Sequence, residues 1–219
     1  GLGAGVDIVY GGAGADTITS GNGDGADVIE GGAGNDIITL GNNEADVWVA
    51  SAATTAAPYV GTNTGTDTVT LTVGASKNVL RLYNLSTVGG AGGTDNWLTG
   101  QFTGGGPIEV VTSATANTDI GAEVIAWDNA GAAPTTTAMA ALFKTTVNTG
   151  NEYFLFNDND AAVVLHGDTA GANIVITAFW IDSTRDGDGT DVTATDVHIL
   201  FVTSNAIDLD TIVTGNIDG

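Results

Sequence analysis

The nine residues GGAGADTIT (11–19) return twenty positions later as GGAGNDIIT (31–39). Both stretches have glycine at positions one, two and four, aspartate at position six and isoleucine at position eight. Glycine adopts backbone conformations that a Cβ forbids, so the first half of the unit predicts a sharp turn. The second half predicts a short strand whose middle side chain points inward. The two stretches therefore predict one structural unit that is used repeatedly.

Three less regular units precede, separate and follow these two. They are LGAGVDIVY (2–10), NGDGADVIE (22–30) and GNNEADVWV (41–49). Position six holds Asp7, Asp16, Asp27, Asp36 and Asp46, and position eight holds Val9, Ile18, Ile29, Ile38 and Trp48. Ser20 and Gly21 interrupt the register once. In the fifth unit Asn42, Asn43 and Glu44 replace the glycines, so this unit is interpreted as a degenerate repeat that caps the end of the array.

A turn of this kind collects oxygen atoms. Its glycine-rich backbone directs carbonyl groups inward, and position six adds a carboxylate. Such oxygen ligands suit a hard cation such as Ca²⁺, which takes six to eight of them. One unit has too few ligands and almost no core, so units must stack and share ions. Glycine-rich low complexity without metal is the alternative, and five tandem units with an apolar position eight argue against it.

The array resembles the RTX (hemolysin-type) calcium-binding repeat, G-G-x-G-x-D-x-U-x. The resemblance implies a parallel β-roll over residues 1–50, with two units per coil and about three Ca²⁺ ions between turns. Asp7, Asp27 and Asp46 would share one edge, and Asp16 and Asp36 the other. The implied metal-ligating residues are Gly3, Gly5, Asp7, Gly12, Gly14, Asp16, Gly23, Asp24, Gly25, Asp27, Gly32, Gly34, Asn35, Asp36 and Asp46.

Residues 51–219 predict a second, β-rich region with one short helix, so the fold class is all-β. The helix is expected at 135–144, with Met139, Leu142 and Phe143 on one packed face. An antiparallel β-sandwich, or a sheet stacked on the roll, is the expected arrangement. The strands are expected at 65–73, 78–85, 96–102, 107–112, 122–127, 151–158, 161–167, 172–182 and 196–203.

The charge balance excludes several partners. The chain has 4 Lys and Arg against 26 Asp and Glu, a formal net charge of -22. Nucleic acid and anionic membranes need a basic face, so neither is an expected partner. No apolar stretch is long enough to span a membrane, and membrane insertion is not expected. Cysteine is absent, so metal ions rather than disulfides are expected to tie the loops together.

Other acidic loops and aromatic residues offer weaker candidate sites. DSTRDGDGTD (182–191) starts like an EF-hand but has Thr193 at position twelve, so the bidentate glutamate is missing. Asp186, Asp188 and Asp191 form either a lone cation site or a solvated hairpin tip. Asp158 and Asp160 flank a turn that is a weaker candidate of the same kind. Trp97, Trp127 and Trp180 serve either core packing or carbohydrate stacking.

No catalytic motif is recognisable in the sequence. His166 and His198 lie in apolar strand patterns, where packing is the ordinary role. The nucleophile elbow G-x-S-x-G, the zinc motif H-E-x-x-H and the phosphate-binding lysine of a P-loop are all missing. We therefore do not expect an enzyme.

RTX repeats ahead of a β-rich region resemble the end of a type I secreted bacterial protein, which implies an uncleaved C-terminal signal and an extracellular or cell-surface location. High Ala, Thr and Gly with little Lys is similar to calcium-dependent surface-layer proteins. The expected function is a calcium-rigidified structural module that self-assembles, with calcium ions, copies of itself and the secretion machinery as partners. The alternative is the calcium-binding and secretion module of a larger RTX adhesin or hydrolase.

Overall fold

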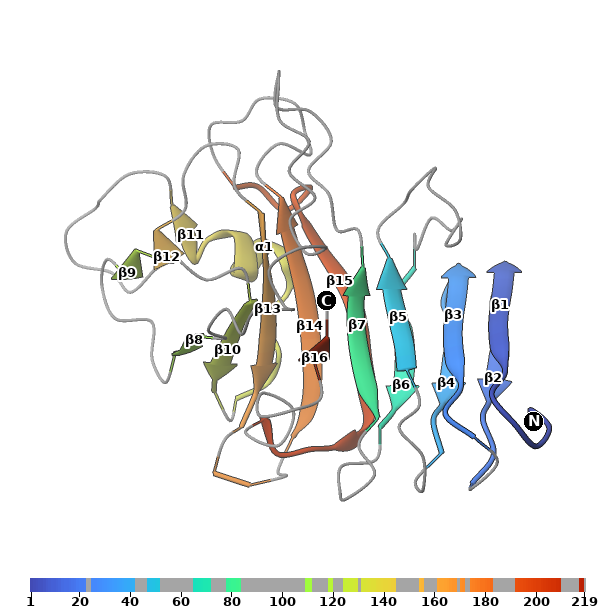
Figure 1. Cartoon of the computed structure of the whole chain (residues 1–219). Helices are drawn as coiled ribbons and strands as arrows, with labels where there is room; N and C mark the ends of the chain where they lie inside the picture. Colours follow the sequence, from blue (N-terminus) through green and yellow to red (C-terminus); the bar gives the residue numbers. More distant parts are fainter. Residues whose placement is uncertain are drawn as a thin grey trace.

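The structure is a computed structural model of the whole chain, shown in Figure 1. It describes residues 1–22, 25–41, 47–51, 65–71, 78–83, 109–111, 118–119, 124–129, 131–144, 154–155, 161–168, 170–171, 174–182, 192–209 and 217–218. Strands are the main secondary structure of these residues, which also include one short helix. The all-β expectation is confirmed.

Two sheets organise the molecule. The first is parallel throughout and runs β1 (Ile8–Ala13), β3 (Val28–Ala33), β5 (Val47–Ser51), β7 (Val79–Tyr83), β16 (Ile217–Asp218). The second runs β2 (Thr17–Thr19), β4 (Ile37–Thr39), β6 (Asp67–Thr70), β15 (Val197–Ala206), β14 (Val175–Asp182), β13 (Ala161–Gly167), β10 (Val124–Asp128), β8 (Glu109–Val111). A small third sheet holds β11 (Phe143–Lys144), β12 (Phe154–Leu155) and β9 (Thr118–Asp119).

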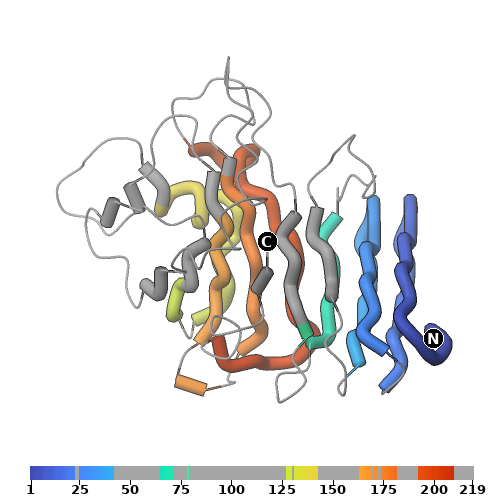
Figure 2. The backbone as a smooth tube through the Cα atoms, in the orientation of Figure 1, coloured from blue at the N-terminus to red at the C-terminus, as the bar shows by residue number. Residues whose placement is uncertain are grey.

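The repeats form coils that place one strand in each sheet. Ile8 of β1 pairs with Val28 of β3, and Thr17 of β2 pairs with Ile37 of β4, so one coil is twenty residues long. The first unit of each coil gives a strand to the five-stranded sheet and the second unit gives one to the eight-stranded sheet. Figure 2 follows the backbone through these coils from the N-terminus. The repeat unit therefore folds as half a coil.

Both sheets continue past residue 50. β6 pairs in parallel with β4, and β7 pairs in parallel with β5, so the strands expected within 65–73 and 78–85 extend the roll. β15 then pairs in parallel with β6, in the place that a further coil would take. The division of the chain into 1–50 and 51–219 stays a prediction.

The expected antiparallel arrangement is only partly right. β13, β14 and β15 are antiparallel neighbours, as expected. β13, β10 and β8 are parallel to one another, and β15 is parallel to β6. The sheet is mixed because its first strands belong to successive coils and therefore run in the same direction. Alternation along a strand predicts which of its side chains face the core, but not which strands it pairs with. The strand expected at 96–102 lies outside the described residues.

The position-eight residues form a buried ladder inside the roll. Ile18, Ile29, Ile38 and Val69 are all buried, and Val9 packs against them at the first coil. Leu40 and Leu71 add a second layer. The same cluster continues without a break into Val163 and Leu165 of β13, Ile176 and Ala178 of β14, and Phe201 of β15. One core therefore joins the coils to the C-terminal strands.

A second core lies on the opposite face of the eight-stranded sheet. The helix α1 (Thr136–Ala140) covers it, and Met139 is fully buried there against Trp127, Val164 and Phe179. The Thr135 hydroxyl caps the helix by accepting a hydrogen bond from the Ala138 backbone N–H at 3.2 Å. The packing role of Met139 is confirmed. The helix is shorter than expected, because Phe143 belongs to β11, which pairs with β12.

Neighbouring isoleucines on β4 test the ladder. Ile38 is fully enclosed, whereas Ile37 is 52 % exposed on the outer face. We predict that Ile38→Ala lowers the free energy of unfolding by about 2–5 kcal/mol, through lost burial and a cavity. Ile37→Ala is the matched control and costs less than about 1 kcal/mol. Equal losses in denaturant titrations would contradict the assignment of faces.

His166 is a fully buried histidine on β13. Its ring meets Trp127 edge-to-face, with the centroids 5.1 Å apart. Neither ring nitrogen has a hydrogen-bond partner among the described residues. Burial lowers the pKa of His166 below its ordinary value, because the apolar surroundings penalise the imidazolium. The packed role expected for this residue agrees with its position.

Protonation of His166 predicts an acid-dependent loss of stability. The unfolded chain takes up the proton near pH 6.5, whereas the folded chain resists it, so stability is intact above pH 6.5 and falls below it. The fall approaches about 1.4 kcal/mol per pH unit. His166→Phe should remove this component between pH 7.5 and 5.5 at fixed calcium, and His198→Gln serves as the histidine control. Identical pH profiles for His166→Phe and the unmodified chain would refute the prediction.

Candidate metal centre

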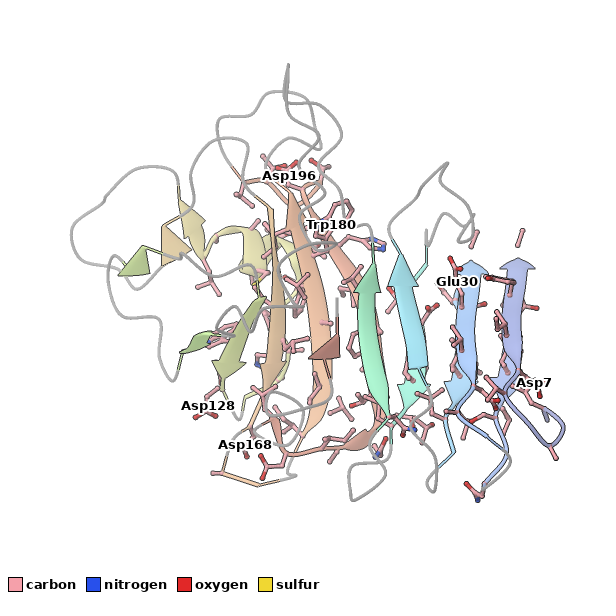
Figure 3. All side chains as sticks on the ribbon, viewed as in Figure 1. Asp7, Glu30, Asp128, Asp168, Trp180 and Asp196 are labelled. Carbon is pink, nitrogen blue, oxygen red and sulfur yellow. The ribbon has the colours of Figure 1, made fainter. Side chains whose placement is uncertain are left out.

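The aspartates at position six stack in two columns, one on each edge of the roll. Asp7 and Asp27 lie in one column, because the Asp7 backbone N–H donates to Oδ1 of Asp27 at 2.9 Å. Asp16 and Asp36 lie in the other, with the Asp16 N–H donating to Oδ1 of Asp36 at 2.9 Å. The two edges match those expected from the repeat. Figure 3 labels Asp7 at the turn before β1.

Three kinds of aspartate atom join one turn to the next. The Asp16 N–H donates to the Asp36 carboxylate, and the Asp16 carbonyl accepts from the Ile37 N–H at 2.9 Å. The Asp7 carbonyl accepts in the same way from the Val28 N–H at 2.9 Å. Backbone N–H, backbone carbonyl and Oδ1 are therefore all used between coils. The second carboxylate oxygen, Oδ2, is left for another role.

The Oδ2 atoms of Asp16 and Asp36 are buried and accept no hydrogen bond from the described residues. Each faces the first glycine of its own unit: a Cβ built on Gly11 would lie 2.7 Å from Oδ2 of Asp16, and one on Gly31 would collide with Oδ2 of Asp36. Glycine is therefore required at this position, because a side chain there would displace the carboxylate. A buried carboxylate oxygen without a partner costs free energy, which a bound cation would recover.

The glycines of positions two and four have the conformation and the space that the turn requires. Gly12 and Gly32 have φ of 103° and 101°, and Gly14 and Gly34 have φ of 115° and 135°. A Cβ on Gly32 would strike the carbonyl oxygen of Gly12, and one on Gly34 would strike that of Gly14. Gly5 and Gly25 repeat this relation on the other edge. Only glycine permits turns to stack this closely.

The remaining expected ligands have mixed outcomes. Gly3 lacks the positive φ, and a Cβ there would meet nothing within 4 Å, so the first turn is less constrained. The Asn35 side chain instead accepts a hydrogen bond from the Thr66 N–H at 2.9 Å through Oδ1. Outside the described residues lie Gly23, Asp24, Asp46, Asp158, Asp160, Asp186, Asp188 and Asp191.

Asp67, a third aspartate in the column of Asp16 and Asp36, was not predicted from the sequence. The Asp36 N–H donates to Oδ1 of Asp67 at 3.1 Å, and the Thr68 N–H donates to the Asp36 carbonyl at 2.8 Å. The signal was present as G-T-D-T-V-T (65–70), which aligns with G-N-D-I-I-T (34–39). It was obscured because Asp67 follows Asp36 by 31 residues and the leading glycine pair is missing.

Two polar residues also fix the coils without carrying charge. Ser20, which interrupts the repeat, is buried, and its hydroxyl accepts from the Gly41 N–H at 2.7 Å. Asn78 precedes β7 as Asp27 precedes β3, and its amide donates to the Gly41 carbonyl at 2.8 Å. The interruption after the second unit is therefore a structural contact between coils.

Glu30 is buried in the repeats, as Asp27 and Asp36 are, and was not expected to be. It occupies position nine of the third unit, and Figure 3 places it further along the strands from Asp7. Its Oε2 has no hydrogen-bond partner among the described residues. Burial raises the pKa of the Glu30 carboxyl. Glu30 adds to the negative potential of this region when it is ionised.

Buried acids outside the repeats differ from Asp16 and Asp36. The Asp196 carboxylate accepts from both the backbone N–H and the hydroxyl of Thr193, at 2.7 and 2.8 Å. Asp168 accepts from the Ala170 N–H at 2.8 Å. Figure 3 labels both on the C-terminal part of the molecule. These carboxylates close local turns.

The stretch of sequence that carries the two columns contains acidic residues but no basic ones. Through residue 76 the sequence has nine acidic residues and no Lys or Arg. Neighbouring strands of a sheet are about 4.8 Å apart, so stacked carboxylates repel one another unless a cation lies between them. No three acidic or histidine side chains of the described residues converge as a metal cluster. The carboxylates would therefore share a cation with backbone carbonyls of the turns, a donor set that suits Ca²⁺.

Comparison with known families identifies the repeats. The family model for the RTX calcium-binding nonapeptide repeat (4 copies) matches residues 3–25 and 23–43. This part of the chain is therefore a run of RTX calcium-binding repeats. Comparison with curated proteins and with solved structures gave no match. Among the described residues no helix is both long and apolar enough to cross a membrane.

Two glycine variants test the stacked turns. Gly32→Ala forces a Cβ into the Gly12 carbonyl at a φ of 101°. We predict a loss of about 1–3 kcal/mol or more in the free energy of unfolding with calcium present. Gly3→Ala is the matched control, because nothing lies within 4 Å of its added Cβ, and it should change stability by less than about 0.5 kcal/mol. Equal effects would show that the turns do not stack as described.

Proposed function

We propose that this chain is an extracellular calcium-binding structural module that has no catalytic role. Calcium binding folds and stiffens its coils, and the stiffened module assembles into a bacterial surface layer or filament. The observation that carries the proposal is the pair of buried Oδ2 atoms on Asp16 and Asp36, which accept no hydrogen bond among the described residues. They lie in stacked turns that the family model covers.

Calcium dependence follows from the balance of forces in these coils. Without a cation the stacked carboxylates repel one another, and the many glycines lose more conformational entropy on folding than other residues do. Ca²⁺ binds the folded turns and not the open chain, so its binding free energy adds to folding. A chain that is open where calcium is scarce and rigid where it is plentiful suits secretion by the type I route.

Assembly is supported by the exposed face of the first coil. β1 and β2 each form one edge of their sheets. Val6, just before β1, is 70 % exposed, and Ile8, the first residue of β1, is 63 % exposed. Edge strands with apolar side chains readily pair with another chain. Copies of the same chain are therefore the proposed partners, once calcium has ordered the coils that carry β1 and β2.

Calcium removal tests this function directly. Far-UV circular dichroism of the full chain should show β-structure with millimolar Ca²⁺ and a large loss of it with excess chelator. Light scattering and electron microscopy should show sheets or filaments only in the calcium sample. Equimolar Mg²⁺ is the control, because Mg²⁺ requires a small octahedral site and should not replace Ca²⁺.

Three outcomes separate the parts of the proposal. Identical spectra and melting temperatures with and without chelator would contradict calcium-driven folding. Calcium-dependent folding that leaves a monomer at all concentrations would contradict assembly and favour the module of a larger RTX adhesin or hydrolase. Folding and assembly that both follow calcium would support the whole proposal.

A further inference from the structure

The second column of aspartates does not end where the family match ends. Asp67 lies beyond residues 3–43, yet its Oδ1 accepts from the Asp36 N–H at 3.1 Å, as Oδ1 of Asp36 accepts from Asp16. Asp36 and Asp67 are each only 1 % exposed. The turn that carries Asp67 lacks the glycine pair of the repeat, so the nonapeptide pattern does not describe it.

The two turns nonetheless stack as closely as the earlier pair. A Cβ on Gly65 would collide with the Gly34 carbonyl oxygen, as one on Gly34 would collide with that of Gly14. The Thr66 N–H donates to Oδ1 of Asn35 at 2.9 Å, which adds a side-chain link between the turns. The interval between Asp36 and Asp67 therefore has the geometry of the interval between Asp16 and Asp36.

Each interval begins at an aspartate with an unpartnered carboxylate oxygen. Oδ2 of Asp16 and Oδ2 of Asp36 are both buried and accept no hydrogen bond from the described residues. The Asp36 side chain is almost fully buried and packs over Gly31, where only a glycine leaves room for its carboxylate. No basic residue precedes Lys77 in the sequence. Burying two adjacent carboxylates, with Oδ2 of Asp36 unpaired among the described residues, costs free energy that a bound cation would offset.

We infer that Asp36 and Asp67 hold a hard divalent cation, with Ca²⁺ as the best match, at the junction between the repeats and the C-terminal sheet. Asp67 is also the first residue of β6, where it pairs with Phe201 of β15. The cation therefore fixes the strand on which β15 pairs. This site extends calcium binding to a segment that the repeat pattern does not reach, and it rests on the proposed calcium-binding function.

Contacts around β6 carry the effect of the cation into β15. The Thr70 and Ser204 hydroxyls are 2.6 Å apart, and the Asn205 amide donates to the Leu71 carbonyl at 3.0 Å. The Thr66 hydroxyl donates to the Ile199 carbonyl at 3.3 Å. These hydrogen bonds can form only when β6 is paired in the sheet. Binding at Asp67 should therefore protect β15 amides from hydrogen exchange.

Asp67→Asn in the full chain tests the site, because asparagine keeps the Oδ1 acceptor for the Asp36 N–H but removes the charge. Equilibrium dialysis should show one bound Ca²⁺ fewer than in the unmodified chain, and hydrogen exchange in residues 197–206 should be faster. Asp16→Asn is the matched control. It should also lose one Ca²⁺ but leave exchange in 197–206 unchanged, because its interval does not adjoin β6.

Asp36→Asn provides a second test that does not depend on folding of the Asp67 variant. Asp36 borders both intervals, so this variant should lose two Ca²⁺ where Asp16→Asn loses one. A full complement of Ca²⁺ in Asp67→Asn, or equal losses in Asp36→Asn and Asp16→Asn, would overturn this inference and leave the proposed function intact. If the unmodified chain binds no Ca²⁺, the proposed function and this inference both fail.

Discussion

The repeat region depends on one hydrogen bond, from the backbone N–H of one aspartate to the carboxylate of the aspartate one coil further on. It occurs from Asp7 to Asp27, from Asp16 to Asp36 and from Asp36 to Asp67. The bond sets the spacing and register of the coils, but it also buries negative charges close together. It occupies Oδ1 of the accepting aspartate, whereas Oδ2 of Asp16 and Oδ2 of Asp36 accept no hydrogen bond from the described residues. The same contact that aligns the coils thus creates their need for a cation.

This constraint explains why glycine is indispensable in some positions and not in others. The turns approach so closely that a Cβ on Gly32 or Gly34 would enter the backbone of the previous turn. Gly3 is under no such constraint, because no earlier turn lies against it among the described residues. The inward isoleucines stack for the same reason, and their ladder continues into the core of the C-terminal strands. Cation binding and core packing are therefore properties of one continuous structure.

The sequence contained enough to predict the coil, its two edges and its inner ladder. The resemblance to the RTX repeat implied the coil of two units, and with it a shared edge for Asp16 and Asp36. The inner ladder followed from strand geometry, since the middle side chain of each short strand, such as Ile18 or Ile38, points inward. The place of Asp67 in the second column was not predicted, because a long insertion breaks the period and the part of the repeat motif that remains is short. Partner strands could not be predicted either. Alternation along β15 shows which of its side chains are buried, but not that β15 pairs with β6. That pairing depends on the position of the unpaired strand edge at the end of the coils.

The central claim is that calcium, and not the protein alone, holds the stacked aspartates together. The most direct test is hydrogen exchange at the backbone N–H groups of Asp7, Asp16 and Asp36, each of which donates to a carboxylate. Measured residue by residue, these amides should be strongly protected in saturating Ca²⁺ and should exchange at close to open-chain rates after chelation. Equal protection in both conditions would show that the coils stand without the cation and would contradict the account.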